Sequence, residues 1–492
     1  MGGTALAVLR DGGRLALSAV PRLDIERFRE ALILGVRGGA RLGALFGHPA
    51  GSDRSMLVAV LLHGASGEIR VGSTEVGRAY PALTPDCPQA HLFEREIAEV
   101  FGIEPAGHPW LKPVRLRTAD DPDWAAFRME GESVHEVAVG PVHAGVIEPG
   151  HFRFQCHGER VFHLEIALGY QHRGVERSLV SGPTKRTIPI IETLAGDTSV
   201  GHAIAYARTV EALSGCVAPE RAEALRSVAL ELERLANHVG DLGALANDVG
   251  YLPASAFCGR LRGEFLNLTA LACGSRLGRG WVRPGGVAHD IERDLAEPIL
   301  ARLEPALEDF HGARDLLRNT STVRARFEET GVLTPEACEE QGLVGVPARA
   351  AGLERDARKE FPTGVYRTAP IPIATWTGGD VFARARVRWM EVDHSAAYVA
   401  DRLRGLPHGE ISTTSGPLAA SESIAVSVVE GWRGEICHVA ITDTAGRFRA
   451  YKVVDPSFHN WTGLALAMRD QAISDFPLCN KSFNLSYCGF DL

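Results

Sequence analysis

The pattern of apolar and polar positions divides the chain into a short strand-rich part and a longer helix-rich part. In residues 1–117, short apolar runs such as MLVAVLLHG (56–64) alternate with glycine-rich turns, as is typical of a small α+β domain. A polar, acidic stretch at 118–135 is predicted to be a linker. Strand-like segments near 137–168 then open a second domain, predicted over 136–492.

The clearest helix is predicted over 219–247, where apolar residues recur at spacings of three and four and form one stripe. These residues are Leu225, Val228, Leu232, Leu235, Val239 and Leu242. Pro219 lies near the start, and Glu220 and Glu223 in the first turn suit the helix dipole.

Further elements follow the same two patterns. Helices are predicted over 254–277, 292–317 and 383–403, and alternating β-branched residues predict strands in 423–443 and 447–454. The expected fold class is therefore α+β: a small N-terminal α+β domain fused to a large, mainly helical domain with peripheral strands.

Composition narrows the functional classes. Hydrophobic residues make up 45%, charged residues 23%, and the formal net charge is −9. No basic stripe with interleaved aromatics is present, so nucleic acid is not expected as a partner. No apolar run approaches the roughly 20 residues of a membrane helix. The nine cysteines include no CxxC pair, which favours reduced structural thiols in a cytoplasmic protein.

The end of the first domain, HLFEREIAEVFGIEPAGHPWLKPVRLR (91–117), resembles the signature of the thirty-kilodalton subunit of respiratory complex I. The remainder resembles the forty-nine-kilodalton subunit, a relative of the large subunit of nickel–iron hydrogenases. The segments that carry this resemblance are GPVHAGVIEPGHFRF (140–154), LGYQHRGVER (168–177), ELERLANHVGDLGALANDVG (231–250), RPGGV (283–287), GGDVFARARVR (378–388) and FPLCNKSFNLSYCGFDL (476–492). Such a fusion is typical of membrane-bound hydrogenases of the formate hydrogenlyase type.

Two segments, ETLAGDTSVGHAIAYARTVEAL (192–213) and YKVVDPSFHNW (451–461), resemble the metal-ligand segments of those hydrogenases. In the family each segment carries a CxxC, and four thiolates hold the metal pair. The matching positions here are Ala195, Thr198, Ser457 and Asn460. None of these supplies a soft thiolate, so the resemblance implies no nickel–iron site and no metal in this chain.

Other positions match residues near that site. Glu148 stands where the hydrogenases keep a proton-transfer glutamate, and Arg433 where they keep an arginine beside the metal ligands. Both residue types also serve in buried ion pairs, which is the plain structural alternative.

Complex I uses the same region to reduce a quinone. Its tyrosine position falls at about Gly196, its loop histidines on His143 and Ile147, and its aspartate on Asp248, which also suits a helix cap. The quinone site implied by the resemblance is therefore incomplete. Histidines are frequent around this frame and suit proton exchange better than metal binding: His143, His151, His157, His163, His172 and His202.

The leading hypothesis is a peripheral-arm subunit of a hydrogenase-related, NADH-quinone oxidoreductase-like complex on the cytoplasmic face of the cell membrane. Its expected partners are a small iron–sulfur subunit and membrane-embedded antiporter-like subunits, and the iron–sulfur clusters belong to the partners. The open alternatives are a non-catalytic scaffold and a quinone-reducing subunit; whether the chain is itself an enzyme stays open. No glycine-rich dinucleotide loop is visible, so NADH would be handled elsewhere in the complex.

The candidate residues line the region of the missing metal. The catalytic candidates are Glu148, Arg433 and Asp248, and the cofactor-binding candidates are His143, Asp197, Thr198, His202, Ser457 and His459. The apolar C-terminal stretch 476–492 is predicted to be buried and to be kept through Leu492, without processing.

Overall fold

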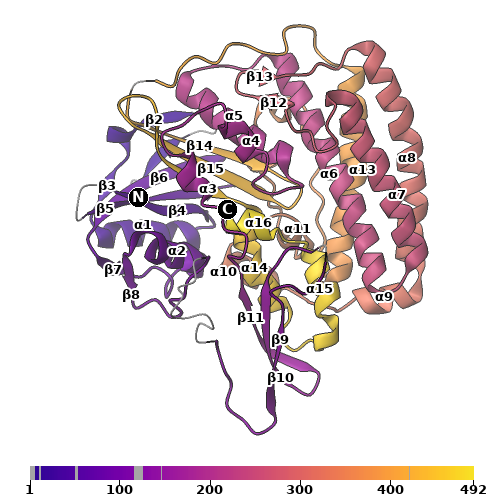
Figure 1. Ribbon diagram of the computed structural model, residues 1–492, viewed down its shortest axis with the longest axis horizontal. Coiled ribbons are helices and arrows are strands. Elements are labelled where there is room, and N and C mark those ends of the chain that lie inside the picture. Colours follow the sequence, from indigo (N-terminus) through magenta and orange to yellow (C-terminus); the bar gives the residue numbers. More distant parts are fainter. Residues whose placement is uncertain (1–5, 10–12, 50–53, 116–125, 146, 420) are drawn as a thin grey trace.

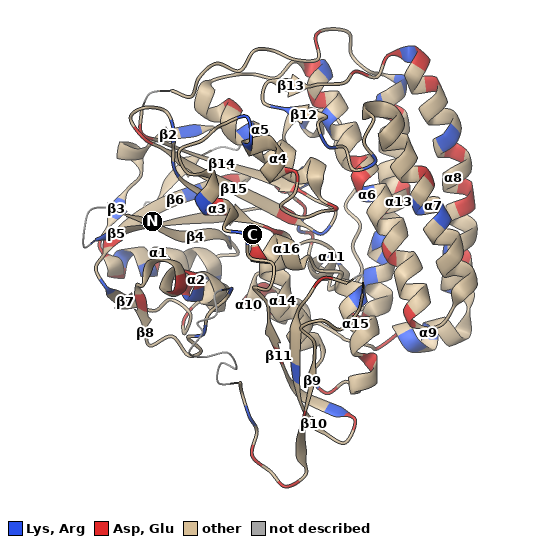
Figure 2. Ribbon diagram, in the orientation of Figure 1, with Lys and Arg blue, Asp and Glu red and all other residues tan. Residues whose placement is uncertain are grey.

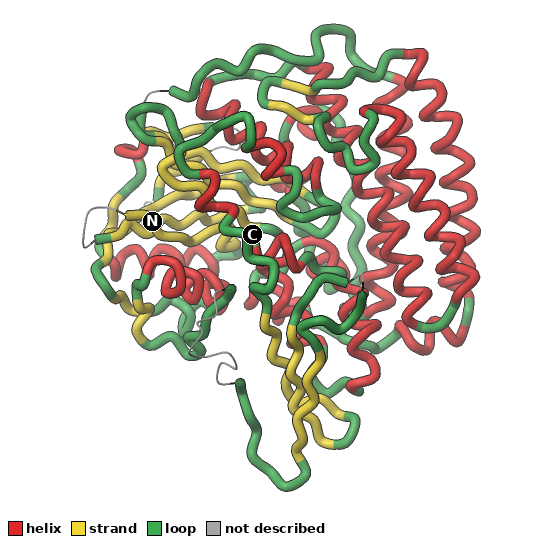
Figure 3. Tube along the Cα trace, in the orientation of Figure 1, coloured by secondary structure: helices red, strands yellow, loops and turns green. Residues whose placement is uncertain are grey.

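The computed structural model describes the chain except for residues 1–5, 10–12, 50–53, 116–125, 146 and 420. Part of the predicted linker over 118–135 therefore lies outside the described residues, and the domain boundaries stay a prediction. The α+β class is confirmed: helices gather on one side of the molecule and most strands on the other (Figures 1 and 3).

The N-terminal part forms a five-stranded sheet with α1 (Ile25–Arg37) and α2 (His91–Phe101) packed beside it (Figure 1). The strand order is β1-β6-β5-β4, and β3 joins β6 in parallel. The strands are β1 (Ala7–Leu9), β3 (Arg22–Leu23), β4 (Arg41–Pro49), β5 (Ser55–His63) and β6 (Glu68–Val76). Helix α1 begins where Asp24 accepts a hydrogen bond from the backbone of Arg27, an N-cap that satisfies a free helix donor.

Four long helices form a bundle at the opposite side (Figure 1): α6 (Glu220–Asp248), α7 (Leu252–Cys273), α8 (Arg293–Asn319) and α13 (Val381–Arg404). They confirm the predicted helices to within a few residues. The apolar stripe of α6 is fully buried, because α7 and α13 pack against this helix. Several charged residues of α6 are buried as well, so both sides of the helix are covered.

A second sheet lies in the interior, between the bundle and the N-terminal part. Its antiparallel order is β16-β15-β14-β2, built from β2 (Arg14–Ala16), β14 (Ser423–Glu430), β15 (Glu435–Thr442) and β16 (Phe448–Val454). Every residue of β14 and β15 is buried. These strands thus form part of the core rather than its periphery, and the first domain contributes β2 to them.

The remaining elements surround this interior. Strands β9 (Val134–Val139), β10 (His151–His157) and β11 (Arg160–Ala167) form an antiparallel sheet, and short pairs join β7 (Ala79–Pro81) to β8 (Glu104–Ala106) and β12 (Val282–Arg283) to β13 (Gly286–Val287). The other helices are α3 (Val175–Leu179), α4 (Thr187–Ile191), α5 (Ser199–Ser214), α9 (Ser321–Phe327), α10 (Pro335–Gln341), α11 (Gly345–Ala350), α12 (Ala357–Glu360), α14 (Pro456–Ala467), α15 (Phe476–Phe483) and α16 (Tyr487–Asp491), with single 3₁₀ turns at η1 (Leu17–Ala19), η2 (Pro88–Ala90), η3 (Gly364–Arg367) and η4 (Ile473–Asp475).

The C-terminal stretch is buried, as its apolar sequence predicts. Leu485, Tyr487, Phe490 and Leu492 are each at most 5% exposed. The carbonyl oxygen of Leu492 accepts hydrogen bonds from the backbone of residues 173 and 174, which anchors the end of the chain beside α3.

Buried ion pairs join the N-terminal part to the rest. On α2, Glu96 binds Lys452 of β16 (2.6 Å) and also Arg115. On β4, Arg41 binds Glu360 (2.6 Å) and Glu435. Because a charge buried without its partner is costly, these contacts fix how the two parts meet.

Acidic and basic positions are interspersed along the bundle helices (Figure 2). Within the part of the chain that the structure describes, no helix combines the length and apolar character needed to cross a membrane.

Replacing Glu96 by Gln is expected to lower the free energy of unfolding by about 3 kcal/mol, because Lys452 and Arg115 lose a buried counter-charge. Urea unfolding of the purified chain measures this loss. The matched control is Glu104→Gln at an exposed position of β8, which should change the free energy by less than about 0.5 kcal/mol. Equal effects of the two substitutions would contradict the role given to Glu96.

The contribution of Glu96 should depend on pH. Burial alone would raise the pKa of Glu96, but Lys452 and Arg115 outweigh it and lower the pKa from 4.5 to about 2. The folded pKa is depressed, so this stabilisation is complete above about pH 4.5 and is lost as pH falls toward 2. The stability gap between the wild type and Glu96→Gln should therefore narrow between about pH 5 and about pH 3. A gap that stays constant over that interval would contradict the assignment.

Candidate functional site

Several of the predicted site residues meet where α5 (Ser199–Ser214) and α14 (Pro456–Ala467) begin, next to the turn between β14 and β15. Asp197 and Arg433 form a two-pronged ion pair, with Oδ1 to Nη1 at 2.6 Å and Oδ2 to Nη2 at 2.8 Å. Arg433 also donates to the hydroxyl of Thr198 (3.2 Å). We call Asp197, Thr198 and Arg433 the site cluster.

The site cluster is held in a fixed geometry. Burial would raise the pKa of Asp197, but the Arg433 guanidinium lowers it, so the pair stays ionised. The guanidinium lies over the Trp432 ring at 3.9 Å, and its Nε donates to the backbone carbonyl of Asn484 (2.6 Å). The indole of Trp432 and the amide of Asn237 both donate to the backbone carbonyl of Asp197.

A chain of hydrogen bonds starts beside this cluster. Asp455 accepts from Nε2 of His202 (3.1 Å), Nδ1 of His202 contacts Nε2 of His438 (3.1 Å), and Nδ1 of His438 contacts the hydroxyl of Tyr451 (2.9 Å). All four side chains are at most 4% exposed. We call Asp455, His202, His438 and Tyr451 the relay.

One assignment of ring protons satisfies every bond of the relay. Burial would raise the pKa of Asp455, but His202 and Arg433 lower it, so the carboxylate accepts from His202. Burial holds the pKa of His438 well below its usual value, so this ring is neutral. In this assignment Tyr451 donates to His438, His438 donates to His202, and His202 donates to Asp455; the tautomers are assigned from this network.

A buried carboxyl group that the sequence did not single out lies next to the site cluster. Glu233 of α6 accepts from the backbone N–H groups of Val200 (2.7 Å) and Gly201 (3.1 Å) at the start of α5. Burial raises its pKa to about 8. At neutral pH this carboxyl group therefore holds a proton, and it lies where a helix N-terminus favours negative charge.

The C-terminal segment packs against the site. Glu148 accepts from the backbone of Tyr487 (3.3 Å) and Cys488 (3.2 Å), and the hydroxyl of Ser457 accepts from the backbone of Ser486 (2.8 Å). Burial raises the pKa of the Cys488 thiol to about 11, and Glu148 acts in the same direction. This thiol is therefore protonated at neutral pH and is a poor metal ligand as it stands.

The side chains at the four positions that the resemblance aligned with the metal ligands have other surroundings. Ala195 has no donor atom, and Thr198 binds Arg433. Asn460 uses its amide oxygen and nitrogen on the backbone of Val344, both at 3.0 Å. Among the described residues, no group of three or more His, Cys, Asp or Glu side chains is arranged to hold a metal ion.

Three predicted residues lie apart from the site cluster. The ring of His143 packs against Phe152, and Asp248 lies near Lys481; burial lowers the pKa of His143 and raises that of Asp248. The ring of His459 packs against Phe93 of α2, and burial lowers its pKa to about 4.

A larger set of buried charges supports the site from the side of the bundle. Arg234 of α6 donates to the backbone carbonyls of Glu430 (2.7 Å) and Gly431 (3.1 Å), directly before Arg433. The ion pairs of Arg234 connect it to a group that we call the core ion network, whose members are all buried: Glu231, Arg234, Arg349, Asp356, Arg358, Glu391 and Glu430.

Sequence reasoning identified Asp197, Thr198, Arg433 and His202, which the structure brings together. It missed Glu233 and three of the four relay residues, although signals for two of these were present. Asp455 precedes Pro456, which is a helix-start signature, and His438 is a polar residue inside an otherwise apolar strand.

Comparisons with known proteins match both parts of the chain. Residues 42–131 match the family described as respiratory-chain NADH dehydrogenase, 30 Kd subunit, and residues 248–423 match the 49 Kd subunit of the same enzyme. The chain is 31% identical to the carbon monoxide-induced hydrogenase of Rhodospirillum rubrum, over 72% of this chain and 98% of that protein. It is 27% identical to formate hydrogenlyase subunit 5 of Escherichia coli, over 83% of this chain and 76% of that protein.

A solved structure has the same fold. A chain of the membrane-bound sulfane sulfur reductase, an archaeal respiratory membrane complex, matches with a TM-score of 0.68 and 22% identity, over 73% of this chain and 99% of that one. The two domain matches and the similarity to the hydrogenase of R. rubrum show the family of this chain. The chain belongs to the family of subunits with thirty- and forty-nine-kilodalton complex I-type domains, which includes the large subunits of membrane-bound hydrogenases.

Proposed function

We propose that the chain is the peripheral-arm subunit of a membrane-bound, hydrogenase-related oxidoreductase complex and moves protons rather than binding nickel and iron. In this proposal it lies on the cytoplasmic face and holds a small iron–sulfur subunit against membrane-embedded antiporter-like subunits. Relatives that belong to membrane-bound hydrogenases and to the F(420)H(2) dehydrogenase of Methanosarcina mazei support the assignment to a complex.

The observation that carries the proton-transfer part is the relay. In one transfer, a proton from outside the relay binds the Tyr451 hydroxyl as that hydroxyl gives its own proton to Nδ1 of His438; His438 gives its Nε2 proton to Nδ1 of His202, and His202 gives its Nε2 proton to Asp455. Tyr451 and both rings stay neutral, Asp455 becomes protonated, and no electron moves. Asp455 then lies next to the site cluster, where the charges of Asp197 and Arg433 respond to it.

The four positions without thiolates support the absence of a nickel–iron site. Ala195, Thr198, Ser457 and Asn460 are the proposed counterparts of the four ligands, and three of their side chains have hydrogen-bond partners in the protein. In this proposal the electrons travel through the iron–sulfur partner, and Glu148, Asp248 and His143 remain candidates for contact with a quinone.

A scaffold without chemistry is the second candidate. It is favoured by the purely structural bonds of Asn460 to the backbone of Val344 and of Ser457 to the backbone of Ser486. The two proposals differ in what they expect of the relay, because a scaffold has no need to transfer protons.

Replacing Tyr451 by Phe removes one hydroxyl and interrupts the relay. We expect the rate at which membranes containing the complex oxidise reduced viologen to fall by about tenfold, the usual scale of a lost proton-transfer group. The matched control is Tyr206→Phe, since Tyr206 is buried in the same core, 6.5 Å from Tyr451 between ring centroids, but lies outside the relay. Unchanged turnover in a fully assembled Tyr451→Phe complex would favour the scaffold.

Metal analysis of the tagged chain purified with its membrane partners tests the absence of nickel. We expect several iron atoms per complex and nickel well below about one atom per chain, because hydroxyl and amide groups do not replace soft thiolates. Nickel near about one per chain would refute the assignment of the four positions.

A further inference from the structure

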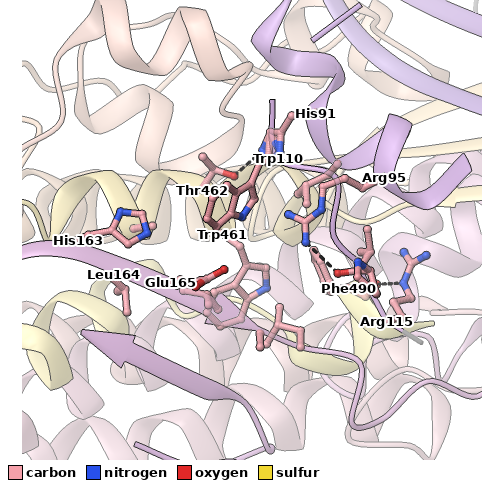
Figure 4. A pocket seen from close by; sticks show the side chains of 17 residues that line it. His91, Arg95, Trp110, Arg115, His163, Leu164, Glu165, Trp461, Thr462 and Phe490 are labelled. Carbon is pink, nitrogen blue, oxygen red and sulfur yellow. Dashed lines mark hydrogen bonds between the residues drawn. The ribbon is translucent and has the colours of Figure 1, made fainter. Parts of the chain in front are cut away.

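A pocket lies where the N-terminal part meets the rest of the chain (Figure 4). Its walls come from α2, from the loop after β8, from β11 and from the helices α14 and α16. Its volume is about 230 Å³, and it opens to solvent. This space is enough for a single ring with one substituent.

The walls are mainly apolar and aromatic. Trp110, Trp461 and Phe490 contribute large flat surfaces. The aliphatic members are Leu92, Pro113, Val114, Leu164, Ile166, Ala167, Leu168 and Ala465. Such walls favour a flat, apolar ligand, since rings stack on aromatic faces and leave water.

Hydrogen-bond donors around the pocket lack partners in the protein. Nε1 of Trp461 and Nη2 of Arg115 are buried without a hydrogen-bond partner, and these residues are only 3% and 5% exposed. Arg95 donates from Nε to the carbonyl of residue 112 and from Nη2 to that of residue 113, both at 2.8 Å, which leaves Nη1 unused among the described contacts. An indole and a guanidinium can only donate, so these groups call for an acceptor.

Arg95 is the lining cation without an ion pair among the described residues. Glu165 is the one acidic side chain among the lining residues, and Lys112 (2.7 Å) and the backbone of Phe127 (2.7 Å) already engage it. Glu165 and Glu99 act on Arg95 only at longer range. Burial lowers the pKa of Arg95 to about 10, so it still carries its charge at neutral pH. Burial lowers the pKa of His91 to about 3, and this neutral ring bonds the hydroxyl of Thr462.

We propose that this pocket binds a small aromatic carboxylate, with the ring between Trp110, Trp461 and Phe490 and the carboxylate on Arg95 and the Trp461 indole. The carboxylate supplies the acceptor oxygens that the donors lack and a direct ion pair for Arg95, which Glu165 and Glu99 reach only at longer range. The ligand contacts both parts of the chain at once, so its binding strengthens the seam that the Glu96 ion pairs also hold. This site is separate from the site cluster and does not depend on the proton-transfer proposal.

Benzoate is the probe, and ligand-observed NMR on the purified full-length chain is the measurement. We expect saturable binding of benzoate with a Kd at or below about 1 mM. Benzamide, which lacks the charge, and acetate, which lacks the ring, should each bind at least about tenfold more weakly, because each loses one of the two recognition elements.

Two variants locate the site. Arg95→Gln should weaken benzoate binding by about tenfold, as expected for a lost charge-assisted hydrogen bond. Trp461→Phe keeps the ring but removes the unpaired donor, and it should weaken binding by about fivefold even if Arg95→Gln disturbs the loop at 112–113. The matched control is Arg386→Gln, because Arg386 lies over Trp376 (3.7 Å) outside the pocket.

Three results would overturn the proposal. The first is the absence of saturable binding up to about 10 mM benzoate. The second is equal affinity for benzamide and benzoate. The third is that Arg95→Gln and Trp461→Phe, like the control Arg386→Gln, leave the affinity for benzoate unchanged. Equal binding of the neutral probe would indicate a site for a neutral ring with carbonyl oxygens, such as a quinone head group.

Discussion

The core ion network is the constraint on which the rest of the structure depends. Four carboxylates and three guanidiniums are buried together, from Glu231 and Arg234 on α6 to Glu430 on β14. Glu391 of α13 alone binds Arg349 (2.6 Å), Arg234 (3.3 Å) and the ring of His238 (2.6 Å). Burying charges is costly unless every charge has a partner, so the helices and the sheet can meet in few other ways. Burial raises the pKa of Glu430 to about 7, which relieves the one surplus negative charge of the network.

This network explains why the site lies where it does. Arg234 fixes the backbone of Glu430 and Gly431, and the turn that follows presents Arg433 to Asp197. Toward the N-terminal part, Glu435 of the interior sheet binds Arg41 of β4, and Lys452 of the same sheet binds Glu96 of α2. The site cluster is thus supported by buried ion pairs on both sides. The protein's own charges therefore set the geometry of the site cluster.

The sequence predicted the long helices well and the interior sheet less well, for physical reasons. The apolar stripe of α6 follows from local periodicity alone. Its charged positions look like a solvated face, whereas Glu231 and His238 are fully buried. Their hydrogen-bond partners lie more than 150 positions away in the sequence: Ser395 binds Glu231, and Glu391 binds His238. Periodicity reports only on neighbours along the chain, so it cannot show that a polar face meets a second polar face. The same limit hid the relay, which joins His202 to Asp455 across 253 positions.

Stability alone gives no physical reason for a buried chain of one tyrosine, two histidines and one aspartate. Apolar side chains of the same volume in a core are often as stabilising or more so, because they pay no desolvation penalty. The relay also contains two imidazole rings, each of which can accept a proton at one nitrogen and donate one from the other, and it ends beside an ion pair that responds to charge. Glu233, whose pKa burial raises to about 8, adds a proton-carrying group at the start of α5. The proposal therefore divides the chemistry between two subunits: the relay and Glu233 of this chain transfer protons, and the iron–sulfur partner carries electrons.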